Sequence, residues 1–440
     1  MSPYKTKLGL AVATGLGFFL CLTPPVAAGQ ETLTLDDAVR EVLARNPSIK
    51  EAEEAIASFE ARVDESHSRL LPQIRGSGSY ARISPLQEIT IPGLGTFQLY
   101  PANNYDAHAG ASQLVYDFGR TRTSVDLSKS LVATAQDRLS LLRRDLRVGT
   151  TLLFDAIVFL ERSLAVQDEH IATLRGHLEV AEKRLAAGTA TELDVLNTKV
   201  RIAGARNERL DLENSRDKEV VALRRLMGRE DAAPMRFEGA FPRRETPLEP
   251  EKLVEEAFAS RLEALAFENL VRTAEIRARL ARLFERPSLS VNVMAGIKNG
   301  FIPNLNIWKF NYTAAVQADV PLFDGGLGKA MEAEAAADLR GLRSRRKEVE
   351  DMIRAEVLEA VADVRASGQK LDLVETNVVQ AAKALDYART RYEAGTTTSL
   401  DLQDAEDARV QAEFLSLRAL YELTRGRVAL DRAVGRQAPD

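Results

Sequence analysis

The sequence predicts a mainly α-helical protein with a small β part, built from two copies of one helix-strand-strand-helix unit. Prolines are absent from residues 102–233 and 322–438, so very long helices can run there without interruption. Four other segments have the length and composition of strands and form two pairs. One phrase also occurs twice, as RLAAGTATELDVL at 184–196 and as RYEAGTTTSLDL at 391–402.

Residues 1–28 are predicted to be a signal peptide. Lys5 and Lys7 precede the apolar run LGLAVATGLGFFLCL, and the small residues Val26 and Ala28 stand where a signal peptidase reads. A membrane anchor is the weaker interpretation, because about 15 apolar residues fall short of the roughly 20 that span a bilayer. We therefore expect export, with cleavage after Ala28.

The mature chain is expected to use neither disulfides nor thiol chemistry, because Cys21 is the single cysteine and lies in the signal peptide. Phe18, Phe19 and Leu20 lack the small residue expected before a lipidated cysteine, which favours an ordinary cleaved signal. The formal net charge is -5, and removing the two signal-peptide lysines makes it -7. This balance gives no electrostatic support for nucleic-acid binding.

The strand candidates follow each other as two hairpins around loops rich in Pro and Gly. Each strand has about ten residues, the length that a tilted strand needs to cross a bilayer. No second apolar run is long enough for a spanning helix, so any membrane insertion must use these strands. The first hairpin is predicted at about 72–118, with strands at 72–83 and 104–118, and the second at about 288–323, with strands at 288–297 and 311–323.

Apolar and polar residues alternate in the second hairpin. Such a pattern with a period of two residues predicts a strand with one apolar face, which can lie against lipid or against a protein core, so a half-buried hairpin of a soluble protein stays possible. Met294 interrupts the alternation. The predicted apolar faces comprise Leu289, Val291, Val293, Ala295 and Ile297 in one strand and Tyr312, Ala314, Val316, Ala318 and Val320 in the other.

An offset of 207 positions aligns the two halves. It matches Asp117 with Asp324 and continues without net insertion to Gly228 and Gly435. The first hairpin carries eight more residues than the second, as an exposed loop tolerates. The duplication divides the chain into a first repeat at 29–228, a linker at 229–247, a second repeat at 248–435 and a tail at 436–440.

Each half predicts one long helix packed along two shorter antiparallel ones. In the first half, Asn46-Pro47 ends a short helix, and a second one follows at 48–70. Residues 121–187 form one helix that would extend about 100 Å, and 191–227 return beside it. Leu, Val and Ala at spacings of three and four form the seam. Considered alone, this stripe favours a cytosolic coiled-coil scaffold.

The strand number argues for assembly. Four membrane strands cannot close a barrel, and an open edge in lipid leaves backbone hydrogen bonds unmet. Three copies would supply twelve strands, an even number within the range of outer-membrane barrels. The duplicated helices would then form a twelve-fold tube beneath them.

From about Leu33 to Gly435 the sequence resembles the TolC-like outer membrane efflux proteins. The motifs are LTLDDAVREVLARNP, LLPQI before the first hairpin, PLFDGG after the second, and the two repeated phrases. The resemblance implies a homotrimer with a 12-stranded β-barrel in the outer membrane of a Gram-negative bacterium and a long α-helical barrel across the periplasm. Its implied partners are a periplasmic membrane-fusion adaptor, an inner-membrane RND, ABC or similar pump, and outer-membrane lipid.

The repeated phrases are placed by the resemblance at the periplasmic tips, at 188–190 and 395–397, where each coiled-coil hairpin reverses. Glycine suits these turns because it permits a positive φ. The tips are expected to dock the adaptor. The predicted docking residues are Gly188, Thr189, Leu193, Gly395, Thr396 and Leu400.

The resemblance also predicts a gate. Asp401 and Asp404 lie three apart on one helix face and match a family ring of aspartates, six in a trimer, that selects charge at the pore constriction; a solvated helix face is the alternative. Tyr392 matches a tyrosine that links neighbouring coiled coils in the closed state, and Asp194 matches its partner position. Thr397 stands where a well-studied family member has a basic residue.

No catalytic, cofactor or metal site is predicted. His170 and His177 share a helix face, but neither a carboxylate nor a cysteine at a suitable spacing completes a metal site, so packing is favoured. A phosphate-cradling Gly-Lys motif is also missing, so energy must come from a partner. The predicted function is a passive exit duct of a tripartite efflux or type I secretion system, open to drugs, metal ions or polypeptides. The alternative is a nonconducting periplasmic coiled-coil scaffold or surface adhesin.

Overall fold

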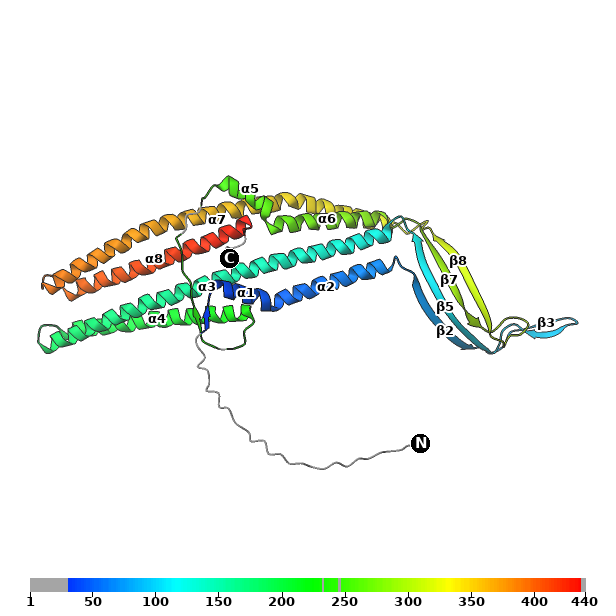
Figure 1. The fold of residues 1–440 in the computed structure, drawn as a ribbon, viewed down its shortest axis with the longest axis horizontal. Helices are drawn as coiled ribbons and strands as arrows, with labels where there is room; N and C mark the ends of the chain where they lie inside the picture. Colours follow the sequence, from blue (N-terminus) through cyan, green and yellow to red (C-terminus); the bar gives the residue numbers. More distant parts are fainter. Residues whose placement is uncertain (1–30, 232, 244–246, 437–440) are drawn as a thin grey trace, which may run out of the picture.

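The computed structural model describes residues 31–231, 233–243 and 247–436. The predicted signal peptide, with its cleavage site and Cys21, lies outside the described residues, as does all but the first residue of the predicted tail. The molecule is elongated, with helices along most of its length and a sheet at one end (Figure 1).

The first half contains two short helices, two long strands and a pair of antiparallel helices. The short helices start where the sequence offers caps: the Thr34 side chain accepts a hydrogen bond from the backbone of Asp37, and Asn46 caps the helix that begins with Pro47. The elements are α1 (Leu35–Arg45), α2 (Pro47–Ser68), β2 (Gln73–Arg82), β5 (Asn103–Tyr116), α3 (Arg120–Ala186) and α4 (Glu192–Met227).

The second half repeats this order. Both long helices have 67 residues, and their bounds differ by 207 at both ends, the same offset as in the sequence. The strand expected to reach Phe323 ends at Asp319, before Pro321. The elements are α5 (Pro250–Ser260), α6 (Leu262–Arg282), β7 (Ser288–Lys298), β8 (Lys309–Asp319), α7 (Leu327–Glu393) and α8 (Ser399–Val434).

Four short strands were not expected. β3 (Glu88–Ile91) and β4 (Gly95–Gln98) form a small hairpin within the long loop of the first half, where the extra residues lie. β1 (Glu31–Leu33) pairs in parallel with β6 (Met235–Phe237), so the predicted linker contains a strand that ties the start of the first repeat to its end.

The long strands of both halves join in one antiparallel sheet, in the order β2-β5-β7-β8. The register between β7 and β8 places Val291 opposite Val316 and Ala295 opposite Tyr312, so the apolar sets of the two strands share a face. Phe310, Tyr312 and Val316 are each exposed by about 70% on that face. A soluble protein seldom exposes such a large apolar surface.

The helices hold the sheet at one end of a long bundle whose packed centre is formed by both halves. Asp117 and Asp324 join strand to helix in the two halves, because their carboxylates accept hydrogen bonds from the first turns of α3 and α7.

Among the described residues, none of the helices combines the length and apolar character needed to cross a membrane. The main core residues are Leu33, Val42, Phe154, Ile157, Leu223 and Met227 in the first half and Leu253, Ile353, Val357, Leu430 and Val434 in the second.

Candidate functional site

The two helical hairpins reverse through turns of the same geometry, at the end of the molecule farthest from the sheet (Figure 1). Gly188 has φ 74° and Gly395 has φ 71°, values in the left-handed region that favours glycine. The residue after each glycine makes the same hydrogen bond in both turns. The hydroxyls of Thr189 and Thr396 each donate to a backbone carbonyl of the preceding helix at 3.1 Å. The sequence repeat therefore encodes one turn used twice.

Asp194 and Asp401 each close a capping box at the start of the returning helix. The Thr191 hydroxyl donates to the Asp194 carboxylate at 2.7 Å, and the Thr398 hydroxyl donates to Asp401 at 2.6 Å. The backbone N–H of each aspartate donates back to the threonine hydroxyl. Sequence reasoning found no structural explanation for these acids, although the T-x-x-D spacing was a signal for one.

The hydrogen bonds lower the pKa of both aspartates. For Asp401 the Thr398 side chain has the largest effect, followed by the Thr398 backbone and the Thr397 side chain, and the pKa falls to about 2. The Thr397 hydroxyl donates to Asp401 at 2.8 Å. Thr397, which stands where a basic residue was expected, therefore also binds this carboxylate. For Asp194 the backbone and side chain of Thr191 lower the pKa. Both acids are therefore charged at neutral pH.

Tyr392 lies against Arg184 of the other hairpin. The Arg184 guanidinium donates to the Tyr392 hydroxyl and lies 4.6 Å from the centroid of its ring. Asp194, the predicted partner position of Tyr392, is bonded to Thr191 and also contacts Ser399 of the other hairpin. Arg184 was not among the predicted gate residues, because its contact joins residues 208 positions apart.

Asp404 pairs with a cation that sequence reasoning missed. Arg201 of α4 donates to Asp404 at 3.0 Å and also to Asp407, so it bridges the returning helices of both hairpins. The Asp404 side chain remains 63% exposed. Leu193 and Leu400 are exposed by 64% and 55% beside the turns, which leaves apolar side chains uncovered at both tips.

The two histidines of α3 pack against carboxylates of another helix. His177 Nε2 lies 2.9 Å from Glu406 Oε1, and His170 Nε2 lies 3.7 Å from Asp407 Oδ1. Both acids belong to α8, so local spacing could not reveal them. Within the described part of the chain, no group of three or more His, Cys, Asp or Glu residues is arranged to hold a metal ion.

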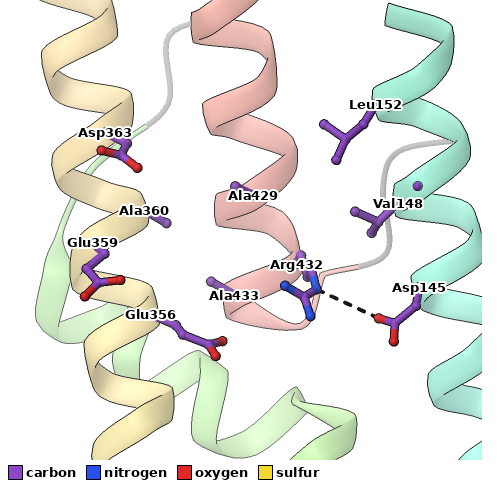
Figure 2. A pocket seen from close by; sticks show the side chains of 11 residues that line it. Asp145, Val148, Leu152, Glu356, Glu359, Ala360, Asp363, Ala429, Arg432 and Ala433 are labelled. Carbon is purple, nitrogen blue, oxygen red and sulfur yellow. Dashed lines mark ion pairs between the residues drawn. The ribbon is translucent and has the colours of Figure 1, made fainter. Parts of the chain in front are cut away.

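A cavity of about 460 Å³ lies between α3, α7 and α8, away from the tips (Figure 2). Among the described residues that line it, Arg432 is the single cation, and it lies 3.9 Å from Asp145. The Glu356 carboxylate on its wall also binds the buried Arg261. The lining contains four carboxylates, those of Asp145, Glu356, Glu359 and Asp363, together with Val148, Gly149, Leu152, Ala360, Ala429, Arg432 and Ala433.

A sheet with an exposed apolar face, continued by two helical hairpins with exposed tips, defines a membrane channel subunit with a long extension outside the bilayer. The chain belongs to the outer membrane efflux protein family, whose model matches residues 38–229 and 253–436. The predicted family, outer-membrane location and role as an efflux channel are thereby confirmed.

Relatives match over nearly the whole length. The chain is 21% identical to the outer membrane efflux protein BepC of Brucella suis, over 95% of this chain and 89% of that protein. It is 24% identical to the pyoverdine export outer membrane protein OpmQ of Pseudomonas aeruginosa, over 90% of this chain and 86% of that protein. The CmeC outer membrane channel of Campylobacter jejuni shares the fold, with a TM-score of 0.79, 15% identity and coverage of 92% and 87%.

Proposed function

We propose that three copies of this chain form one exit duct, with a twelve-stranded barrel in the outer membrane and a helical barrel in the periplasm. The sheet carries this proposal, because its apolar face is exposed and its outer strands, β2 and β8, pair with no further strand of the described ranges. In lipid such edges must pair. Each copy contributes four strands, so three copies close the barrel with twelve.

The duct is passive and works with partners. The tips dock a periplasmic membrane-fusion adaptor, and an inner-membrane RND, ABC or similar pump supplies the energy in a tripartite efflux or type I secretion system. The exposed Leu193 and Leu400 support docking, because apolar side chains rimmed by polar residues mark interaction surfaces. Catalysis is not part of this function.

The tips also gate the duct. Asp401 and Asp404 form the constriction and select charge, as rings of acidic side chains do in cation channels. Tyr392 and Asp194 belong to the closing contacts. The bonds from Arg184 to Tyr392 and from Arg201 to Asp404 support this role, because each joins one hairpin to the other and must break if the hairpins separate.

Membrane extraction followed by native mass spectrometry tests the assembly. We expect the mature protein to leave washed membranes only with detergent and to have the mass of three copies. A monomer released by salt alone would contradict the duct and favour the periplasmic scaffold or adhesin.

A further inference from the structure

The polar face of the sheet carries a row of charges near the end that is farthest from the helices. The register places Asp106 of β5 opposite Lys298 of β7, and Lys298 opposite Lys309 of β8. Residues that face each other across antiparallel strands lie on the same side of the sheet. Two lysines directly opposite each other repel, so this pair does not serve the stability of the sheet.

Neither lysine is neutralised within the part of the chain that the structure describes. Lys298 and Lys309 form no ion pair there, and their ammonium groups lie 5.3 and 5.9 Å from the centroid of one ring, that of Phe301. The neighbouring Asp106 carboxylate is bonded to His108 Nδ1 instead. The loop between the strands thus gathers two ammonium groups around one aromatic side chain.

A third cation lies closer to the helices on the same face. Arg75 of β2 is exposed. It stands opposite Gly110, which lies four residues along β5 from Asp106, the member of the charged row in that strand. It forms no ion pair with any described residue. Arg75 lines a depression of about 430 Å³ whose other residues are polar or small, apart from Val293 and Met294.

The lumen of the proposed barrel must be lined by this face, because the opposite face carries Phe310, Tyr312 and Val316 and is the one suited to lipid. The hairpin loops lie at the end away from the helices (Figure 1), so the lysine row lies near the outer mouth. Two lysines per copy amount to six in a trimer, against three Asp106 carboxylates.

We propose that this row, with Arg75 below it, forms a cationic exit vestibule that favours anionic solutes, such as carboxylates, phosphates and sulfates. This inference rests on the proposed trimeric duct. The vestibule has the opposite sign to the aspartates of the periplasmic tips. A lining of one charge sign raises the local concentration of counter-ions, so anions that pass the tips meet attraction at the exit.

The test is the ratio of chloride to potassium permeability, obtained from reversal potentials in planar bilayers under a salt gradient. The starting protein carries Asp401→Ala and Asp404→Ala, so that the periplasmic aspartates do not dominate the ratio. Adding Lys298→Gln and Lys309→Gln should lower the ratio roughly twofold to tenfold in dilute salt. Adding Lys298→Glu and Lys309→Glu should lower it further, and molar salt should remove both differences by screening.

Arg82→Gln provides the matched control. Arg82 is a basic residue of β2 near the same end, but its register position with Asn103 puts it on the face of Tyr80, away from the lysines. This variant should keep the ratio. Unchanged ratios in channels that insert and conduct would overturn the vestibule and leave the duct intact. If the starting protein and the wild type both fail to conduct, the duct itself is wrong and the vestibule falls with it.

Discussion

Gly188 and Gly395 allow each helical hairpin to reverse, because both adopt a positive φ with open space around the position of a Cβ atom. Gly395→Ala should therefore destabilise the protein by about 1 kcal/mol through backbone strain alone. The change is measured as a lower thermal midpoint by circular dichroism in detergent. Gly368→Ala is the matched control, because Gly368 also has open space but lies inside α7. There alanine should stabilise the helix by about 1 kcal/mol, and equal effects at both sites would contradict the turn.

Asp155 is a buried carboxyl in α3, next to the core residue Phe154. Burial raises its pKa from 3.8 to about 6. A raised carboxyl pKa means that the folded state binds the proton more tightly, so stability falls as the pH rises from about 4 to about 6. Above that window the ionised group costs on the order of 3 kcal/mol.

Asp155→Asn should remove this cost while it keeps the shape of the side chain. We expect a higher thermal midpoint than that of the wild type at pH 7.5 and a gain about half as large at pH 5. A gain that does not change between the two pH values would show that burial does not penalise the charge of Asp155.

The tip hairpins contact each other through Arg184 and Tyr392, which combines a hydrogen bond with a cation-π contact. Tyr392→Phe combined with Asp194→Ala should raise the single-channel conductance, because it removes one inter-hairpin bond and one helix cap. Arg184→Ala should raise it more than Tyr392→Phe alone, because the phenylalanine ring still attracts the guanidinium. Unchanged currents in all three variants would remove these residues from the gate.

Helix lengths could be predicted because their signals are local. The absence of proline allows 67 residues of helix, and a glycine two positions after Ala186 and after Glu393 marks the end of each one. The β1-β6 pair and the contacts of His177 with Glu406 could not be predicted, because they join segments about 200 residues apart. The capping boxes could have been predicted in part. Their T-x-x-D spacing is visible in the sequence, but Asp194 and Asp401 were assigned to the gate alone.

The two halves are also joined at the centre of the bundle by buried charges. Arg261 is 1% exposed and binds Glu263 of α6 and Glu356 of α7, and Arg144 of α3 binds Glu263 at 2.6 Å. Burial alone would raise the pKa of Glu263, but hydrogen bonds from Arg144 and Arg261 and the charge of Arg261 lower it to about 2. A lowered carboxyl pKa stabilises the fold above pH 4.5, and this contribution is lost as the pH falls towards 2.

Arg261→Met should destabilise the protein by roughly 1 to 3 kcal/mol at pH 7, because Glu263 then keeps only Arg144 and the partly exposed Glu356 loses its cation. The loss should shrink at pH 3.5, where Glu263 is partly protonated in the unfolded state. Thermal midpoints in detergent at both pH values measure it. Arg345→Met, at an exposed position of α7, is the matched control and should change neither midpoint. Equal losses from the two variants would show that the buried network does not hold the halves together.

Single-channel recording tests the proposed duct most directly, with purified wild type compared to Asp401→Ala/Asp404→Ala in a planar bilayer. Both side chains lie near the tips, and the pKa of Asp401 of about 2 keeps it charged in any physiological buffer. We expect a small current from the wild type that grows, or loses its preference for cations, in the double variant. Failure of both proteins to insert or conduct would contradict the gated trimeric duct.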